Sequence, residues 1–434
     1  MSNNITIYPL TNRKYAVLLK NGRILAIEQA QKDAVFRYYS TGESIADPLL
    51  HSLVSENQAQ QIHGSQYIAL TLNISNCCNM NCKYCFEHGD TYQMKEQIMS
   101  AETALKAVDY FVQNYPGIRR LKFFGGEPLL NLKVIQAVCS HLQEYCEQGR
   151  IAFLPEYRII TNGTLISEAF ADLVNTYSIQ VIVSVDGPEP IHNANRVMKD
   201  GSGSFHLVKE KIAFLQAKTG GKQPVSLEAT YTRAHETSPM DVADTVKSLK
   251  NLFGVDRINL SEVMSNNPEI QLNEGQGIYP ALPKIFRRLS DHEDVMPQKV
   301  QDMLKRIRKG AVSEERICGA AINSFAVAAD GSVYPCYMMI GNPEFYMGSI
   351  QKPETIQSIG SRICAQFRAQ TRLDSEKCLQ CDAYPYCVGC MGINHAVTGS
   401  CFESSPEYCR TMRELIRQCV VYLVEHDYER YKLH

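Results

Sequence analysis

The sequence lacks three features that would place it in other classes of protein. Its formal net charge at pH 7 is −2, so it lacks the basic surplus that is typical of nucleic-acid-binding proteins. Residues 1–20 hold no basic segment followed by an apolar one, so we expect no secretory signal. No uninterrupted apolar run approaches the ~20 residues that span a bilayer. We therefore expect a cytoplasmic protein that binds neither nucleic acid nor a membrane.

Cysteine is absent from residues 147–317, although the chain of 434 residues holds 16 cysteines. Four lie in 77–85, two in 139–146 and ten from Cys318 onward. So many cysteines without a signal peptide favour metal or redox use over disulfides. A chain of this length suggests two or three domains, and the gap indicates a boundary near residues 295–315.

The cysteines in 77–85 lack the fourth ligand that a closed iron–sulfur site would need. Cys78, Cys82 and Cys85 have the spacing C-x3-C-x2-C after an apolar run at 67–72, and no fourth cysteine follows at ferredoxin-like spacing. Three thiolates on one loop can hold three corners of a cubane iron–sulfur cluster, which leaves one iron with an open coordination site. An open site implies chemistry or a bound ligand. On the triplet alone, a zinc loop remains the alternative.

From residue 66 to about 265, apolar β-rich segments alternate with helical ones. The expected strands are 67–74, 120–124, 157–161, 179–185, 225–232 and 257–263. The expected helices between them are 100–114, 132–148, 167–176, 205–218 and 239–253. Alternation of this kind predicts parallel strands with right-handed crossovers. A closed barrel needs eight such units, so six predict an α/β fold with an open, TIM-like partial (β/α)6 barrel.

Polar residues follow the ends of these strands, where parallel barrels bind their ligands. Gly125–Pro128 follows the second strand, and its adjacent glycines let the backbone approach a ligand closely. Within that motif, Glu127 can accept from an ammonium group. Asn162 follows the third strand, Ser184 ends the fourth, and Arg196 comes shortly after it. We expect these side chains to share one rim.

Together these motifs resemble those of the radical S-adenosylmethionine (radical SAM) superfamily, which combines C-x3-C-x2-C with GGEP and SxDGP motifs. The resemblance implies that the open iron binds SAM and that an electron from the cluster cleaves it to a 5′-deoxyadenosyl radical. It also implies that Glu127 holds the SAM amino group, that Ser184 lies near the ribose and that Arg196 pairs with the carboxylate. For Arg196, an exposed helix charge is the alternative. The implied cofactor-binding residues are Tyr84, Gly125, Gly126, Glu127, Pro128, Asn162, Ser184 and Arg196.

A second, regular cysteine pattern begins at Cys318. The spacing is C-x12-G-x4-C from Cys318 to Cys336, then C-x2-C-x5-C-x2-C from Cys378 to Cys390, then Cys409. Two C-x2-C pairs could form a zinc ribbon. The full order resembles the SPASM domain, which implies two auxiliary [4Fe–4S] clusters and three clusters in all. The departure is the last interval of the central block, which has two residues where the family has three.

The resemblance assigns the later cysteines to two clusters. The first auxiliary cluster would be held by Cys318, Cys336 and Cys390. The second would be held by Cys378, Cys381, Cys387 and Cys409. With three evident ligands, the first cluster is open, binds substrate or recruits a spare such as Cys364 or Cys401. We expect ordinary buried thiols at Cys77, Cys139, Cys146 and Cys419.

We expect four parts along the chain: a small N-terminal α+β module at 1–65, the barrel at 66–295, a helical bridge at 296–316 and the SPASM domain at 317–434. In the module, Asn21-Gly22 between apolar runs predicts a hairpin. Many peptide-modifying radical SAM enzymes carry a leader-peptide-binding domain in this place. Because the module has no specific motif, a structural cap is the alternative.

SPASM enzymes mostly act on peptides or proteins. The resemblance therefore implies a radical SAM oxidoreductase that crosslinks side chains of a ribosomally made precursor peptide with a leader sequence, through a cyclophane-type C–C or a thioether bond. A flavodoxin or ferredoxin would supply electrons. The alternative is an anaerobic sulfatase-maturing enzyme that forms formylglycine; those enzymes usually carry an Asp where this chain has Tyr337. By position alone, Glu262, Asp186 and Tyr337 are candidate general bases.

Overall fold

The structure is a computed structural model, and it describes residues 5–41, 43–55, 67–85, 94–265, 267–288, 296–313 and 316–432. Within these ranges, no helix is long and apolar enough to cross a membrane. The chain forms two compact units. We call Ser65–Ile278 with Gly319–Ala369 the barrel unit, and Met1–Gly64 with Tyr279–Cys318 and Gln370–His434 the terminal unit. The domain boundaries expected from the sequence stay a prediction.

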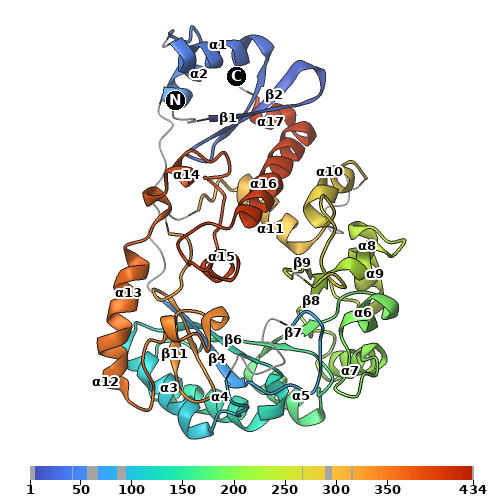
Figure 1. The fold of residues 1–434 in the computed structure, drawn as a ribbon, viewed down its shortest axis with the longest axis vertical. Coiled ribbons are helices and arrows are strands. Elements are labelled where there is room, and N and C mark those ends of the chain that lie inside the picture. The colour runs from blue at the N-terminus through green and yellow to red at the C-terminus, as the bar shows by residue number, and fades with distance from the viewer. Residues whose placement is uncertain are drawn as a thin grey trace. The chain divides into compact units, whose positions relative to one another are not determined.

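The barrel unit is built on an eight-stranded sheet with the order β11-β10-β4-β5-β6-β7-β8-β9 (Figure 1). Six consecutive strands are mutually parallel. They are β4 (Ile68–Ser75), β5 (Ile118–Gly125), β6 (Glu156–Thr161), β7 (Gln180–Ser184), β8 (Ser226–Tyr231) and β9 (Ile258–Glu262). The partial barrel of six β/α units is therefore confirmed.

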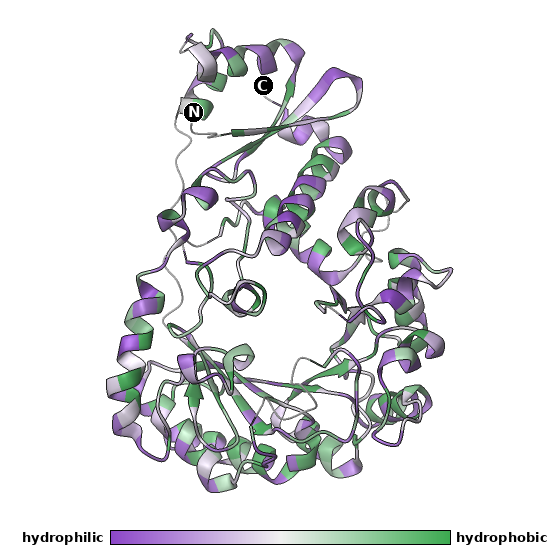
Figure 2. Cartoon of the chain, in the orientation of Figure 1, coloured by the Kyte–Doolittle hydropathy of each residue, from purple (hydrophilic) through white to green (hydrophobic). Residues whose placement is uncertain are grey.

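Helices connect these strands as the alternation predicts. They are α3 (Ala101–Asn114), α4 (Leu132–Glu147), α5 (Glu168–Tyr177), α6 (Glu189–Asn195), α7 (Phe205–Lys218), α8 (Arg233–Glu236) and α9 (Val242–Phe253). Ser100 caps α3 by accepting from the Thr103 N–H. The strands are largely hydrophobic in Figure 2, and residues such as Leu72 and Phe123 are fully buried. This burial fixes which face of each strand points to the helices.

Two further strands extend this sheet at the β4 edge. β10 (Ser324–Val327) pairs with β4 in parallel, and β11 (Val333–Tyr334) pairs with β10 in antiparallel. The elements that follow are η4 (Tyr337–Met339), η5 (Pro343–Phe345), α12 (Pro353–Thr355), the π-helical turn η6 (Ile356–Gly360) and α13 (Ser361–Arg368). The first part of the cysteine-rich region thus completes the barrel sheet, which the sequence pattern did not indicate.

The terminal unit holds a three-stranded antiparallel sheet of β1 (Ile5–Pro9), β2 (Lys14–Leu19) and β3 (Ile24–Glu28). The predicted hairpin is confirmed, with Gly22 at a φ of +83°. Its other elements are η1 (Thr11–Arg13), α1 (Gln29–Thr41), α2 (Pro48–Ser55), α10 (Ile278–Arg288), α11 (Gln298–Arg308), η7 (Arg372–Asp374), α14 (Glu376–Leu379), α15 (Met391–Thr398), α16 (Pro406–His426) and α17 (Tyr428–Tyr431). The long helix α16 packs against this sheet and against α11. The polar linker expected after α2 lies outside the described residues.

Candidate active site

The cysteine triplet lies on the loop that follows β4, and the end of β5 holds one side of it. The Gly126 N–H donates to the Ser75 carbonyl at 2.8 Å, and the Glu127 N–H donates to the Cys77 carbonyl at 2.8 Å. A Cβ on Gly126 would lie 2.5 Å from the Cys77 oxygen, and one on Gly125 2.0 Å from the Ser75 oxygen. The glycines are needed here because the β5 end approaches the cysteine loop itself, whereas the sequence suggested approach to a ligand.

The other side of the loop is held by the segment after α6. The Asn81 N–H donates to the Val197 carbonyl at 2.8 Å, and the Lys83 N–H donates to the Asn195 carbonyl at 3.0 Å. The thiols of Cys78, Cys82 and Cys85 stay partly exposed. The loop is thus fixed at both sides, and its three cysteines keep part of their surface accessible.

Two side-chain N–H groups point at these thiols. Asn162 Nδ2 lies 3.7 Å from Cys78 Sγ, and Arg196 Nη1 lies 4.0 Å from Cys82 Sγ. Hydrogen bonds to sulfur and nearby positive charge stabilise and tune iron–sulfur clusters. Burial raises the pKa of Cys78 to about 12, so a bound metal cluster is what would favour its thiolate form. These residues fit a [4Fe–4S] cluster.

The described cysteines do not converge as they would around one small ion. No three His, Cys, Asp or Glu side chains in the described ranges group closely enough to hold a single metal ion. Thiolates that bind the corners of a cubane stand farther apart than the ligands of one zinc ion, because the cluster itself separates them.

Glu127 is fully buried and joins the ends of β5 and β6. Its carboxylate accepts from the Leu129 N–H at 2.9 Å, from Thr161 Oγ1 at 2.7 Å and from the Asn162 N–H at 2.8 Å. Burial raises its pKa to about 7, and these three donors counteract the rise. A carboxylate has about four acceptor positions, so one remains for a further donor. Its predicted bond to the SAM amino group stays a prediction.

Arg196 belongs to a buried charged network. Its Nε donates to Asp186 Oδ1 at 3.0 Å, and the Tyr84 hydroxyl donates to Asp186 Oδ2 at 2.6 Å. Asp186 Oδ1 also accepts from the Thr230 N–H at 3.0 Å. Arg196 is only 8% exposed, so the alternative of an exposed helix charge is wrong. The network holds the guanidinium beside the cysteine loop, with Nη1 4.0 Å from Cys82 Sγ, and its predicted pairing with the SAM carboxylate stays a prediction.

Two buried histidines form hydrogen bonds to the backbone of Asp186. His192 Nδ1 accepts from the Asp186 N–H at 3.4 Å, and its Nε2 bonds Ser204 Oγ at 2.9 Å. His235 Nε2 bonds the Asp186 carbonyl at 3.0 Å. Burial lowers the pKa of both rings, that of His192 to about 4. His235 was not predicted, although it follows the end of β8 as the other motif residues follow their strands.

The remaining rim residues are placed as follows. Pro128 is buried at the start of η2 (Pro128–Asn131), and Ser184 is half-buried at the end of β7. The Glu262 carboxylate accepts from the Ile278 N–H at 2.6 Å. The Tyr337 ring packs against Phe124, with a centroid distance of 4.9 Å. Because Asp186 and Glu262 already accept backbone or side-chain donors, their predicted roles as general bases have no support from these contacts.

Four later cysteines lie together in the terminal unit. The electrostatic neighbours of the Cys387 thiol include those of Cys378, Cys381 and Cys409, and its burial raises its pKa to about 12. Cys378 lies on α14, and Cys409 lies in the first turn of α16. The loop between them is held by Arg372, which is 3% exposed and donates to the Tyr384 and Cys387 carbonyls. This grouping fits the set predicted for the second auxiliary cluster.

The set predicted for the first auxiliary cluster is divided between the units. Cys318 and Cys390 belong to the terminal unit and Cys336 to the barrel unit, so their grouping stays a prediction. Within the terminal unit, a Cβ on Gly389 would lie 2.5 Å from Ile317 Cγ2. The segments carrying Cys318 and Cys390 are therefore neighbours.

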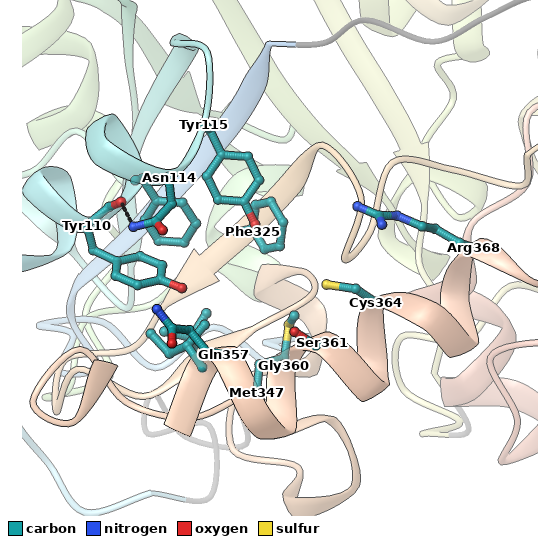
Figure 3. A pocket seen from close by; sticks show the side chains of 13 residues that line it. Tyr110, Asn114, Tyr115, Phe325, Met347, Gln357, Gly360, Ser361, Cys364 and Arg368 are labelled. Atoms are coloured by element: carbon teal, nitrogen blue, oxygen red, sulfur yellow. Dashed lines mark hydrogen bonds between the residues drawn. The ribbon is translucent and has the colours of Figure 1, made fainter. Parts of the chain in front are cut away.

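Cys364, one of the two suggested spare ligands, lies on α13, and its binding to a cluster stays a prediction. It lines a pocket of about 300 Å³ between α3 and α13, with Tyr110, Tyr115 and Arg368 (Figure 3). The thiols of Cys139, Cys401 and Cys419 are buried as ordinary core thiols are. Cys77 and Cys146 are partly exposed, so the expectation of burial is wrong for these two.

Two family models match the chain. The radical SAM superfamily model matches residues 72–227, and the iron–sulfur cluster-binding domain model called SPASM matches residues 318–382. The radical SAM cyclopropyl synthase TigE of Paramaledivibacter caminithermalis is 25% identical over 82% of this chain and 75% of its own length. A cysteine-type anaerobic sulfatase-maturating enzyme of Clostridium perfringens is 26% identical over 78% of this chain and 92% of its own length.

Solved structures have the same fold. Native anSMEcpe with bound AdoMet gives a TM-score of 0.64 at 23% identity over 84% of this chain and 98% of its own. Streptococcus suis SuiB bound to S-adenosylmethionine gives 0.53 at 15% identity over 94% of this chain and 99% of its own. The cofactors of this family are SAM and [4Fe–4S] clusters, which the thiols described above fit. The chain is a radical SAM enzyme that carries a SPASM domain.

Proposed function

We propose that this enzyme matures a ribosomally made precursor peptide by crosslinking two of its side chains oxidatively, through a C–C or a thioether bond. The observation that carries this proposal is the position of Tyr337 after Cys336. Sulfatase-maturing enzymes usually carry an Asp there, whereas this chain places an aromatic ring against Phe124. Without that carboxylate, the proton-abstracting step of formylglycine formation lacks its base.

The bound cofactors would supply one-electron cleavage of SAM and, from it, a radical able to take hydrogen from an unactivated carbon. Cys78, Cys82 and Cys85 would hold the cluster, and Asn162 and Arg196 would donate to its sulfur ligands. The predicted SAM contacts would come from the rim of β5–β8. Burial of this rim would exclude water, and a reactive radical requires such exclusion to avoid side reactions.

A peptide substrate is supported by what related structures contain. SuiB has been solved bound to its precursor peptide SuiA, and anSMEcpe bound to the Cp18Cys peptide. We propose that the module of β1–β3 with α1 and α2 binds the leader of this chain's substrate, and that a flavodoxin or ferredoxin supplies the electrons. Because such clusters are oxygen-sensitive, we place the reaction in the reducing cytoplasm.

Anaerobic sulfatase maturation is the second candidate, since the similarity to the Clostridium perfringens enzyme extends over 92% of that protein. Anaerobic co-expression with short open reading frames encoded beside the gene separates the two. We expect one precursor to lose two hydrogens per modification in a mass spectrum. Unmodified precursors, together with conversion of a cysteine to an aldehyde in a sulfatase-derived peptide, would establish the second candidate instead.

A further inference from the structure

A partly buried cation, Lys122, faces the inside of the barrel, and the chemistry described above does not use it. Lys122 lies on β5 between Leu121 and Phe123, which are fully buried on the helix side of the sheet. Its Nζ lies 4.1 Å from the Tyr337 ring centroid and 5.1 Å from that of Phe124. No carboxylate of a described residue lies within 4.0 Å of this Nζ. Burial lowers the pKa of Lys122 to about 8, and the Glu228 carboxylate counteracts this from beyond contact distance, so the ammonium has aromatic rings beside it and no carboxylate in direct contact.

The strands beside Lys122 present unsatisfied polar groups to the same interior. Lys122 pairs with Thr71 of β4 and with Arg158 of β6 in the sheet register. Two residues beyond Thr71, Asn73 is 1% exposed, and neither polar atom of its side chain has a hydrogen-bond partner. The Nε of Arg158 is also buried and without a partner. Buried polar groups in folded proteins are rarely left unbonded, so each of these atoms is available to a bound water or to a polar group of a ligand.

The opposite wall of the barrel carries the complementary feature. Glu228 lies on β8 and accepts from Asn259 Nδ2 at 3.1 Å. It forms no ion pair with Lys122 within 4.0 Å among the described residues. Arg158 already donates from Nη2 to the Glu156 carboxylate at 3.2 Å, so Lys122 carries the positive charge that attracts a carboxylate entering the barrel, whereas Glu228 repels it. The positive charge on β5 and the negative charge on β8 therefore favour an anionic group that lies on the β5 side of the barrel interior.

We propose that Lys122, with Arg158 and Asn73 beside it, binds a carboxylate of the peptide substrate inside the barrel. This inference rests on the proposed function, since it names a chemical property of that substrate. A carboxylate accepts from an ammonium, a guanidinium Nε and an amide Nδ2, so it provides an acceptor for each of these three donors. The carboxylate is either an acidic side chain near the modified residue or the C-terminus of the peptide. Lys122 thereby selects among peptides.

Protection of Lys122 from acetylation tests the site without knowledge of the natural substrate. The reconstituted enzyme is treated with limiting acetylating reagent beside one of three probes at equal millimolar concentration: acetyl-Gly-Glu-Gly amide, its Gln counterpart, or acetyl-Gly-Gly-Gly with a free carboxylate. We expect one carboxylate probe to lower Lys122 acetylation roughly threefold or more, and the Gln probe to leave it unchanged. The exposed Lys106 on α3 is the internal control. Equal acetylation of Lys122 with all three probes overturns the proposal.

Kinetics with the modified precursor provide a second measurement. Lys122→Met is expected to raise KM for the precursor about 10- to 100-fold, because a charge-assisted hydrogen bond is lost. Lys122→Arg should restore most of the affinity, and the control Lys106→Met should change nothing. Neutralising the acidic residue or amidating the C-terminus of the precursor should remove the effect of Lys122→Met. An unchanged KM for Lys122→Met overturns the proposal. Protection by a probe without modification of any precursor would instead refute the proposed function alone.

Discussion

At the scale of single residues, Asp186 shows how contacts revise a role inferred from position. Its place after β7 made it a candidate base, but its carboxylate accepts from Arg196, Tyr84 and the Thr230 N–H. Burial alone would raise its pKa, but Arg196 and the other donors hold it below the ordinary value. A carboxylate with a lowered pKa is a poor base. Asp186 instead holds the Arg196 guanidinium in place beside Cys82.

Replacing Asp186 tests this anchoring role. In Asp186→Asn, the buried Arg196 loses its counter-charge, and a broken buried ion pair costs about 3–5 kcal/mol. We expect a fall of about 100-fold or more in SAM cleavage, measured as 5′-deoxyadenosine formed with dithionite. The exposed Asp200→Asn, on a surface turn, is the control and should behave as wild type. Wild-type cleavage by Asp186→Asn would show that Arg196 needs no anchor.

The pKa of His192 predicts how stability depends on pH. Burial lowers this pKa from 6.5 to about 4, so the folded state favours the neutral ring, and stability is lost as the pH falls through the unfolded value. Between pH 7.5 and 5.5 we expect the free energy of unfolding to drop by about 1 kcal/mol through this group. Urea denaturation at both pH values measures the drop, which His192→Gln should reduce. An identical drop in this variant would contradict the assignment.

At the scale of elements, motif positions could be predicted from the sequence, but not what each motif touches. Strand ends followed from alternating apolar segments, and each was found within a few residues of its expected place. Contacts between segments distant in the sequence could not be predicted. Two examples are the pairing of β10 with β4 and the hydrogen bond that Glu127 accepts from the Thr161 hydroxyl. The inward position of Lys122 could not be predicted either, because a lysine in a strand is expected to face solvent and the sequence does not show that this face of β5 lines the barrel interior.

The contact between β5 and the cysteine loop gives a prediction for Gly126. A Cβ there would lie 2.5 Å from the Cys77 carbonyl oxygen, so Gly126→Ala must displace the loop that carries Cys78. We expect a loss of about four of the roughly twelve irons that three cubanes hold. Gly149→Ala, whose Cβ would meet nothing within 4 Å, should keep its iron. Full iron content in Gly126→Ala would mean that the loop tolerates the displacement.

Arg372 provides the corresponding prediction for the later cysteines. Its guanidinium donates to the carbonyls of Ser313, Tyr384 and Cys387, and Arg372→Met leaves these acceptors without partners. Each buried unsatisfied group costs about 1–3 kcal/mol, so the loop should lose its shape. We expect about four irons fewer per chain while the SAM-binding cluster remains. The exposed Arg362→Met is the control. A variant that retains all its iron would contradict this role for Arg372.

At the scale of the whole molecule, each compact unit combines segments that are distant in the sequence. The terminal unit combines segments from both ends of the chain with Tyr279–Cys318, and the barrel unit takes Gly319–Ala369 from the cysteine-rich region. Sequence patterns report local periodicity and spacing, so they cannot show which distant segments share a core. The predicted sets of cluster ligands came from spacing and a family resemblance, and they stay predictions.

The central claim is that this radical SAM enzyme crosslinks a precursor peptide. The most direct test is an anaerobic reaction of the reconstituted enzyme with SAM, dithionite and the precursor found by co-expression. We expect about one 5′-deoxyadenosine per crosslink, a peptide lighter by two hydrogens, and neither product with Cys82→Ala. Formation of 5′-deoxyadenosine with a peptide of unchanged mass, or a modified peptide from Cys82→Ala, would contradict the account.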